Sequence, residues 1–210
     1  MIKLDFILYV ATGKRYSCVI IKNEGVNVQY KKIEFGSDQT KITITLLEES
    51  MGKGLIGMVS SPLFRENIAL VVSEEDETDG YTFAGLGYGK NNVAPCVLMT
   101  TELYNGLMAG CTMAKTAVMH EVGHYYNEDK GSDGNDCEEI RRKLVIQNKV
   151  CIKEIKADAF AVKYLGKNVA VAGLNALKDK ILTEYMGCEE ESVLLSVREL
   201  EIRISKINEE

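Results

Sequence analysis

The sequence lacks any run of about 18 apolar residues, the length that a helix needs to cross a bilayer. Its start, MIKLDFILYVATGKRYSC, has no basic beginning, long apolar stretch or small-residue cleavage site of a secretory signal, and Asp5 interrupts its only apolar run. These absences predict a soluble, cytoplasmic protein without membrane insertion.

Basic residues are fewer than acidic ones, 25 against 31, so the net charge is −6. An acidic molecule repels phosphate backbones, and we therefore expect no nucleic-acid partner. Hydrophobic residues make up 46% and charged residues 27% of 210 residues, a composition that excludes disordered and collagen-like chains. The length fits one domain spanning residues 1–210.

The six cysteines include no C-x-x-C pair, so neither a zinc ribbon nor a dithiol redox motif is indicated. In a reducing compartment we expect them to be thiols that pack as small buried hydrophobic residues.

Strand patterns dominate the first half of the chain and helix patterns the second. Alternating β-branched and aromatic residues predict strands at 16–21, 26–35, 68–72 and 81–83. Helical periodicity predicts helices at 114–126, 139–165, 168–182 and 190–207. Segment 38–50 fits either a strand or a helix. This order indicates an α+β fold, with a strand-rich half (1–110) and a helical half (111–210).

Three segments that resemble ligand loops fail the corresponding patterns. Residues 85–90 (GLGYGK) and 51–54 (MGKG) match no nucleotide motif, and the first is expected to be a hairpin or surface loop. Residues 129–136 do not have the acidic spacing of an EF-hand and are expected to join two helices.

The most informative segment is HEVGH, residues 120–124. On a helix, His120 and His124 lie on one face, so both imidazoles can bind a single ion. Zinc suits two nitrogen ligands and an open position for water. Glu121, the next residue around the helix, could then take a proton from that water. These are the only two histidines in the chain, which argues against incidental core histidines.

Gly123 lies inside this helix, where glycine costs about 1 kcal/mol relative to alanine. We therefore expect a close approach to the helix backbone at this position.

A catalytic zinc site also needs a third protein ligand, which cannot be a histidine here. Glu154 is the best carboxylate, because it lies with Asp158 on one face of a second predicted helix. In this arrangement Glu154 binds the metal, and Asp158 accepts a hydrogen bond from a ligating imidazole. The other candidates, with less suitable spacing, are Asp136, Glu138, Glu139 and Cys151.

The HEVGH segment followed by E-x-x-A-D-x-x-A (154–161) resembles the gluzincin metallopeptidases, especially soluble relatives of the CAAX prenyl protease and heat-shock membrane peptidase family, and more loosely phage-type repressor-cleaving peptidases. The resemblance covers about residues 112–207, and its C-terminal part, with Arg198 and Arg203, is weak. It implies a zincin-like fold with a mostly antiparallel sheet on the active-site helix. It also implies His120, His124 and Glu154 as zinc ligands and Glu121 as general base and acid. Asp158 is implied as a residue that supports the zinc ligands.

The chain departs from this family in two respects. It has no membrane-spanning segment, and it has no further histidine to stabilise the oxyanion. The candidates for that role are an arginine and four tyrosines: Arg203, Tyr104, Tyr125, Tyr126 and Tyr164.

The leading hypothesis is a single-domain zinc endopeptidase that cleaves a protein or peptide. Segment 94–100 is our candidate for an edge strand that pairs with an extended substrate, with an ordinary core strand as the alternative. The alternative function is a non-catalytic zinc-binding interaction or regulatory domain with a peptidase-like fold.

Overall fold

The computed structural model describes residues 6–11, 16–21, 29–48, 54–72, 84–89, 93–127, 135–185 and 191–209. Its strands are β1 (Phe6–Ala11), β2 (Tyr16–Ile21), β3 (Tyr30–Phe35), β4 (Ile42–Leu47), β5 (Gly54–Ser60), β6 (Ile68–Val72), β7 (Ala84–Gly89) and β8 (Val93–Met99). Its helices are α1 (Thr101–Ala109), α2 (Thr112–Tyr126), α3 (Asn135–Ile146), α4 (Ile152–Leu165), α5 (Lys167–Glu184) and α6 (Glu191–Glu209). The predicted α+β class is confirmed.

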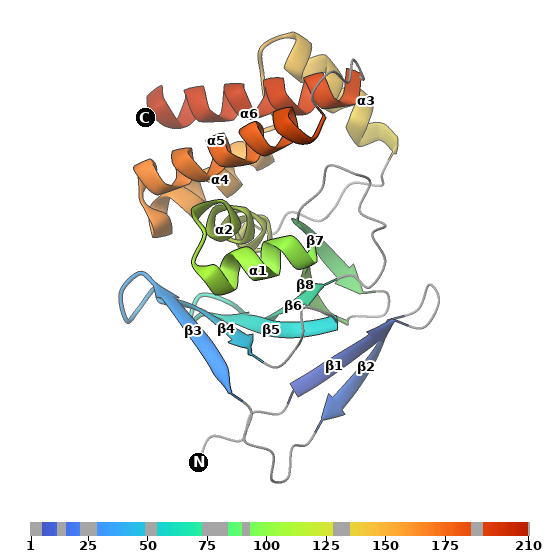
Figure 1. Cartoon of the computed structure of the whole chain (residues 1–210), viewed down its shortest axis with the longest axis vertical. Helices are drawn as coiled ribbons and strands as arrows, with labels where there is room; N and C mark the ends of the chain where they lie inside the picture. Colours follow the sequence, from blue (N-terminus) through green and yellow to red (C-terminus); the bar gives the residue numbers. More distant parts are fainter. Residues whose placement is uncertain are drawn as a thin grey trace.

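Six of these strands form one mixed sheet in the order β3-β4-β5-β6-β8-β7 (Figure 1). Neighbouring strands are antiparallel except β6 and β8, which run parallel. The remaining strands, β1 and β2, pair with each other in a separate antiparallel sheet.

The prediction of an edge strand at 94–100 is wrong, and the alternative of a core strand is correct. Strand β8 occupies most of this segment and pairs with β6 on one side and β7 on the other. Its backbone groups are therefore used in two ladders and cannot receive another strand. The glycine-rich segment expected to be a hairpin or surface loop forms β7, which pairs with the following strand β8 as an antiparallel hairpin, so the expectation of a hairpin is confirmed. Among the described residues, β7 is the end strand of the sheet.

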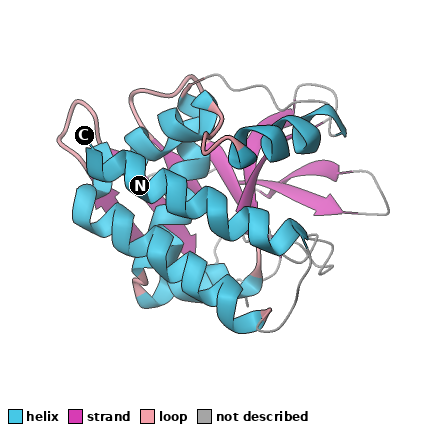
Figure 2. Ribbon diagram, turned by 90° about the horizontal axis from the view of Figure 1, so that it is seen from above, coloured by secondary structure: helices cyan, strands magenta, loops and turns pink. Residues whose placement is uncertain are grey.

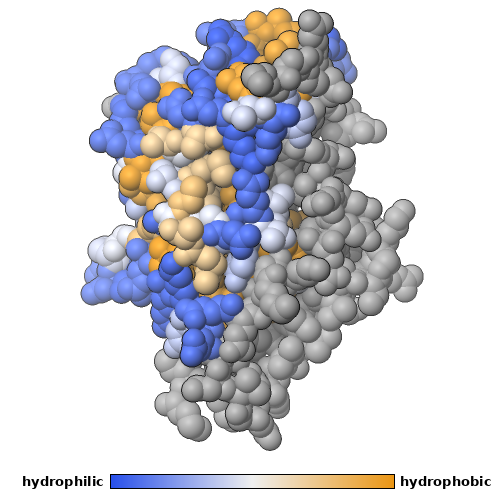
Figure 3. Space-filling model, viewed as in Figure 1, coloured by the Kyte–Doolittle hydropathy of each residue, from blue (hydrophilic) through white to orange (hydrophobic). Residues whose placement is uncertain are grey.

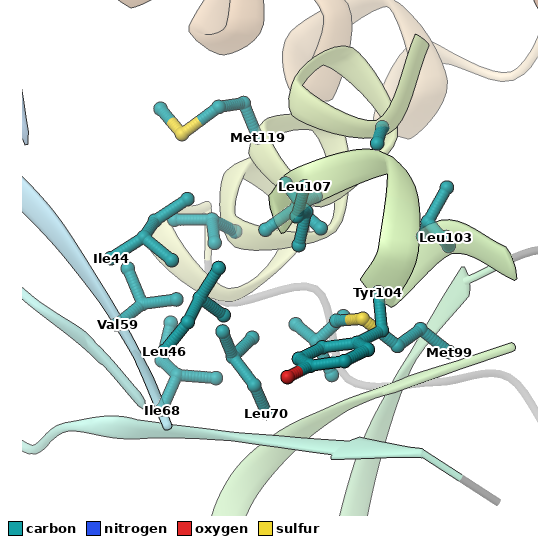
Figure 4. Packing of buried hydrophobic residues seen from close by; sticks show 14 of the residues in the cluster. Ile44, Leu46, Val59, Ile68, Leu70, Met99, Leu103, Tyr104, Leu107 and Met119 are labelled. Carbon is teal, nitrogen blue, oxygen red and sulfur yellow. The ribbon is translucent and has the colours of Figure 1, made fainter. Parts of the chain in front are cut away.

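The main core lies between this sheet and helices α1 and α2 (Figure 4). Ile44, Leu46 and Leu70 project from the sheet toward Leu107 on α1 and Met119 on α2, and all five are fully buried. Burial of such side chains is the main favourable contribution to folding. The core therefore fixes α2 against the sheet.

Helix α2 lies between the sheet and the other helices. It packs against β7 and β8 on one side and against α4 and α5 on the other. The helices lie over one face of the six-stranded sheet (Figures 1 and 2). On the face shown in Figure 3, hydrophobic residues are interspersed with hydrophilic ones. No helix in the described ranges is both long and apolar enough to cross a membrane.

Several element boundaries differ from the predictions. The undecided segment 38–50 contains a strand, β4, and helix α1 was not predicted. The single helix predicted at 139–165 is two helices, α3 and α4, because Asn148 adopts a left-handed conformation (φ 60°) and ends α3. Lys149 N–H donates to Leu144 C=O at 2.8 Å, a bond that completes the helix C-cap.

The other predicted helices correspond to α2, α5 and α6, and β2 and β6 have the predicted bounds. Residues 26–28 and 81–83 of the predicted strands, and the segments 51–53 and 129–134, lie outside the described residues.

Candidate metal centre

Helix α2 brings the two imidazoles together. His120 and His124 are one turn apart on this helix, and their ring centroids are 4.7 Å apart. Their Nε2 atoms are 3.1 Å apart, so both nitrogens point to the same region of space. His120 is buried and His124 is partly exposed. Both rings can therefore donate a lone pair to one ion while one side of the site stays accessible.

Helix α4 supplies the third donor. Glu154 Oε2 is 3.0 Å from His120 Nε2, and Glu154 Oε1 is 3.5 Å from His124 Nε2. In a tetrahedral zinc site with bonds of about 2.0–2.1 Å, two ligand atoms are about 3.3 Å apart. The separations of these donor atoms are close to that value. Among the described residues, His120, His124 and Glu154 form the one group of metal-ligating side chains with this proximity.

The close approach expected at Gly123 is confirmed. A Cβ atom at this position would lie 2.9 Å from Ala157 Cα and 3.0 Å from Phe160 Cβ on α4. These separations are shorter than van der Waals contact, so only glycine allows α2 and α4 to pack this closely. Because Glu154 lies on α4, the same contact sets the distance between Glu154 and the two histidines.

Gly123→Ala is therefore expected to weaken zinc binding by at least about tenfold and to lower stability by about 1–3 kcal/mol, the usual effect of overpacking. Zinc titration and thermal unfolding measure the two effects. Gly173→Ala is the matched control, because its Cβ would clash with Thr116 at the α2–α5 contact. We expect Gly173→Ala to lower stability with little change in zinc affinity. Equal zinc affinities in both variants and the wild type would show that the α2–α4 spacing does not matter.

Asp158 lies against His120. The His120 Nδ1–H group donates a hydrogen bond to Asp158 Oδ1 at 2.8 Å, and Asp158 is buried. With the proton on Nδ1, the Nε2 atom that faces Glu154 keeps its lone pair. Carboxylates that orient a metal-ligating histidine in this way also increase its basicity.

The site combines buried charges of both signs. Burial and the nearby Arg203 guanidinium lower the pKa of His120, but Asp158 and Glu154 raise it more, to about 9. Burial raises the pKa of Glu154, but the hydrogen bond and charge of His120 lower it more, to about 2. The Arg203 guanidinium and His120 likewise hold the pKa of Asp158 far below its ordinary value despite burial. Both carboxylates are thus anionic at neutral pH, whereas His120 has to release its Nε2 proton when a cation binds.

Arg203 of α6 reaches this cluster from the side of α4. Its Nε and Nη2 atoms donate to the two oxygens of Asp158 at 2.8 and 2.6 Å. Its Nη1 atom lies 3.4 Å from Glu154 Oε2, and Nη2 lies 2.9 Å from His120 Nδ1. The sequence suggested Arg203 only as one of several oxyanion candidates. Its spacing to Asp158 follows no local motif and could not be read from the chain.

Glu121 follows His120 on α2 and is partly buried. Burial raises the pKa of Glu121 above its ordinary value, and the charges of His120 and His124 oppose that shift. A carboxylate with a raised pKa is a stronger base, a property that suits proton transfer near neutral pH.

The alternative third ligands lie elsewhere or are not described. Glu139 is exposed and pairs with Lys143 at 2.5 Å, and Cys151 precedes α4 as a free thiol. The side chains of Asp136 and Glu138 lie outside the described residues. Cys111 is also a free thiol. The prediction of burial is wrong for Cys111, which is exposed immediately before α2.

The tyrosines suggested for the oxyanion role are placed differently from one another. The Tyr104 hydroxyl donates to Leu47 C=O at 3.0 Å in the main core, so Tyr104 has a structural role. Tyr125 packs edge-on against Phe64, and Tyr126 packs against Phe160. Tyr164 also packs against Phe160.

Comparison with known proteins identifies no relative, because no family model, curated protein or solved structure matches the chain.

Proposed function

We propose that the protein is a zinc-dependent endopeptidase with a zincin-like active site. One observation carries the proposal: two imidazole Nε2 atoms lie 3.1 Å apart and 3.0–3.5 Å from the two oxygens of the Glu154 carboxylate, with Glu121 on the same helix. A structural zinc site is usually closed by four protein ligands, mostly cysteines. Three ligands from α2 and α4, with a carboxylate beside them, favour a catalytic site.

His120, His124 and Glu154 would hold the ion. Zinc, when bound, supplies Lewis acidity that acidifies water and polarises a carbonyl group. Asp158 keeps the proton of His120 on Nδ1, so that Nε2 remains a lone-pair donor. Once His120 has released its Nε2 proton to make room for the ion, the chain provides two neutral nitrogens and one anionic oxygen.

Glu121 would perform the proton transfers. Its carboxylate accepts a proton from the attacking water, and the resulting carboxylic acid then donates that proton to the leaving amine. The raised pKa of Glu121 supports this role, since the group must hold the proton between the steps.

An extended substrate has a place to bind beside α2. Strand β7 packs against α2 and pairs on one side with β8, so within the described residues its other edge carries unpaired backbone groups. A peptide that adds to β7 as a further strand would run alongside the helix with His120 and His124. We therefore place the substrate at β7, not at β8.

Metal removal tests the proposed function directly. The purified protein is expected to contain about one zinc ion per chain and to cleave a peptide library, with cleavage lost after chelation and restored by added zinc. Metal analysis and mass spectrometry of the digest measure these results. Zinc-loaded protein that leaves the library and unfolded proteins intact would favour the alternative, a non-catalytic zinc-binding domain with a peptidase-like fold.

A further inference from the structure

Arg203 contacts both acidic residues that α4 contributes to the metal centre. Two of its nitrogens hold the Asp158 carboxylate in a fork at 2.6 and 2.8 Å, and the third lies 3.4 Å from Glu154 Oε2. Its side chain is only 10% exposed. A bidentate pair of this kind fixes the orientation of the carboxylate as well as its charge.

The cluster needs such a cation. Glu154 and Asp158 are one helical turn apart, and two carboxylates at this spacing repel each other. Burying charges is strongly unfavourable unless they are paired and hydrogen-bonded, so the two acids need a cation that reaches both. Arg203 supplies a fixed positive charge between the two acids.

A further buried acid lies near Arg203. Glu199, one turn earlier on α6, is buried and accepts a hydrogen bond from Arg141 Nε of α3 at 2.6 Å. Its negative charge favours the Arg203 cation and raises the pKa of that guanidinium.

We propose that Arg203 is a positioning residue of the metal centre, which holds the carboxylates of Asp158 and Glu154 in their orientation before the metal binds. This inference rests on the proposed function only for the identity of the three metal ligands. In this role Arg203 acts through two carboxylates and does not contact the substrate. It is therefore distinct from the oxyanion role suggested by the sequence.

The test measures zinc affinity of the metal-free protein by competition with a chromophoric chelator, and no cleavage assay is involved. Arg203→Met is expected to weaken zinc binding by about 10- to 100-fold, as is typical for residues that support metal ligands. Arg203→Lys should lose less zinc affinity, because lysine keeps the positive charge although it cannot form the two-point contact with Asp158. Arg198→Met is the matched control, since Arg198 lies on the same helix in an exposed ion pair with Glu201. We expect wild-type zinc affinity for Arg198→Met.

A double-mutant cycle with Asp158→Asn separates positioning from a general effect on folding. Because Arg203 acts partly through Asp158, the loss of zinc affinity in the double variant should be smaller than the sum of the two single losses. In the double variant Arg203→Met, Asp158→Asn, neither member of the pair is charged, so no unpaired charge is buried. This variant can therefore be measured even if Arg203→Met alone does not fold. If Arg203→Met does not fold, the zinc affinity of Arg203→Lys is compared with that of Arg198→Lys instead. Wild-type affinity in the Arg203 variants, or losses that simply add, would overturn the proposal.

These outcomes are independent of peptidase activity. A wild-type protein that binds zinc tightly but cleaves nothing would contradict the endopeptidase proposal. The zinc affinities of the Arg203 variants would still decide the role of Arg203. A wild-type protein that binds no zinc would contradict both.

Discussion

Glu121→Gln is expected to reduce peptide cleavage by at least about 100-fold and up to about 10,000-fold, the usual contribution of a general base. Glutamine has the size and shape of glutamate but cannot accept the proton of the attacking water. Zinc affinity should remain within about threefold of the wild type, because the donor atoms belong to His120, His124 and Glu154. Cleavage rates from single-peptide assays and zinc titration measure the two quantities in the same preparation.

The control for this prediction is Glu102→Gln. Glu102 is an exposed glutamate on α1 that pairs with Lys180 at 2.7 Å and does not belong to the ligand cluster. Its substitution should leave both cleavage and zinc binding unchanged. Cleavage by Glu121→Gln at the wild-type rate would refute the proposed role of Glu121 as the base, even if zinc proved essential.

Glu154→Ala is expected to weaken zinc binding by more than about 100-fold, beyond the range typical of residues that only support the ligands. The substitution removes the one anionic donor and leaves two imidazoles, which are too few to hold zinc tightly. It also removes a negative charge that neighbours the Arg203 cation at 3.4 Å. Cleavage should fall in parallel, since the loss occurs at the metal-binding step. Zinc competition titration and the cleavage rate at saturating zinc distinguish lost affinity from lost turnover.

Glu139→Ala and Cys151→Ala are the matched controls, because both residues were alternative third ligands by sequence. Glu139 is exposed and paired with Lys143, and neither residue belongs to the ligand cluster. Both variants should bind zinc as the wild type does. Tight, stoichiometric zinc binding by Glu154→Ala would mean that another side chain completes the site.

Sequence patterns predicted the elements in which periodicity and end signals agree. Strand β6 is a short β-branched run with clear ends, and α5 and α6 have long helical periods, so their types were evident. The break between α3 and α4 was missed because the periodic residues continue through it. Its one local signal is Asn148, which tolerates the left-handed conformation that ends a helix.

Helix α1 was missed although its ends carry recognisable signals. Thr100 caps its first turn by accepting a hydrogen bond from Leu103 N–H at 3.2 Å, and Gly110 ends it at φ 79°.

The edge of the sheet could not be predicted from the sequence. An apolar strand such as β8 and a glycine-rich one such as β7 do not reveal which of them is outermost, since that depends on long-range pairing.

The candidate site was partly predictable, because some of its residues are neighbours along one helix and others meet only in the fold. His120 and His124, and likewise Glu154 and Asp158, are each one helical turn apart, and such local spacing is visible in a sequence. The meeting of the two helices depends on Gly123, whose unfavourable place in a helix was a signal of close packing. The fork between Arg203 and Asp158 joins residues 45 positions apart, and no local rule indicates such a partner.

The position of α2 between two layers also determines how this centre fluctuates. Its backbone amides can exchange hydrogen with solvent only when the sheet or the α4–α5 layer moves away from it. Such openings expose much of the main core, so their free energy approaches that of global unfolding. The histidines are thus carried on a helix that we expect to open rarely. Glu154, near the start of α4 and partly exposed, belongs to a segment that can fray separately.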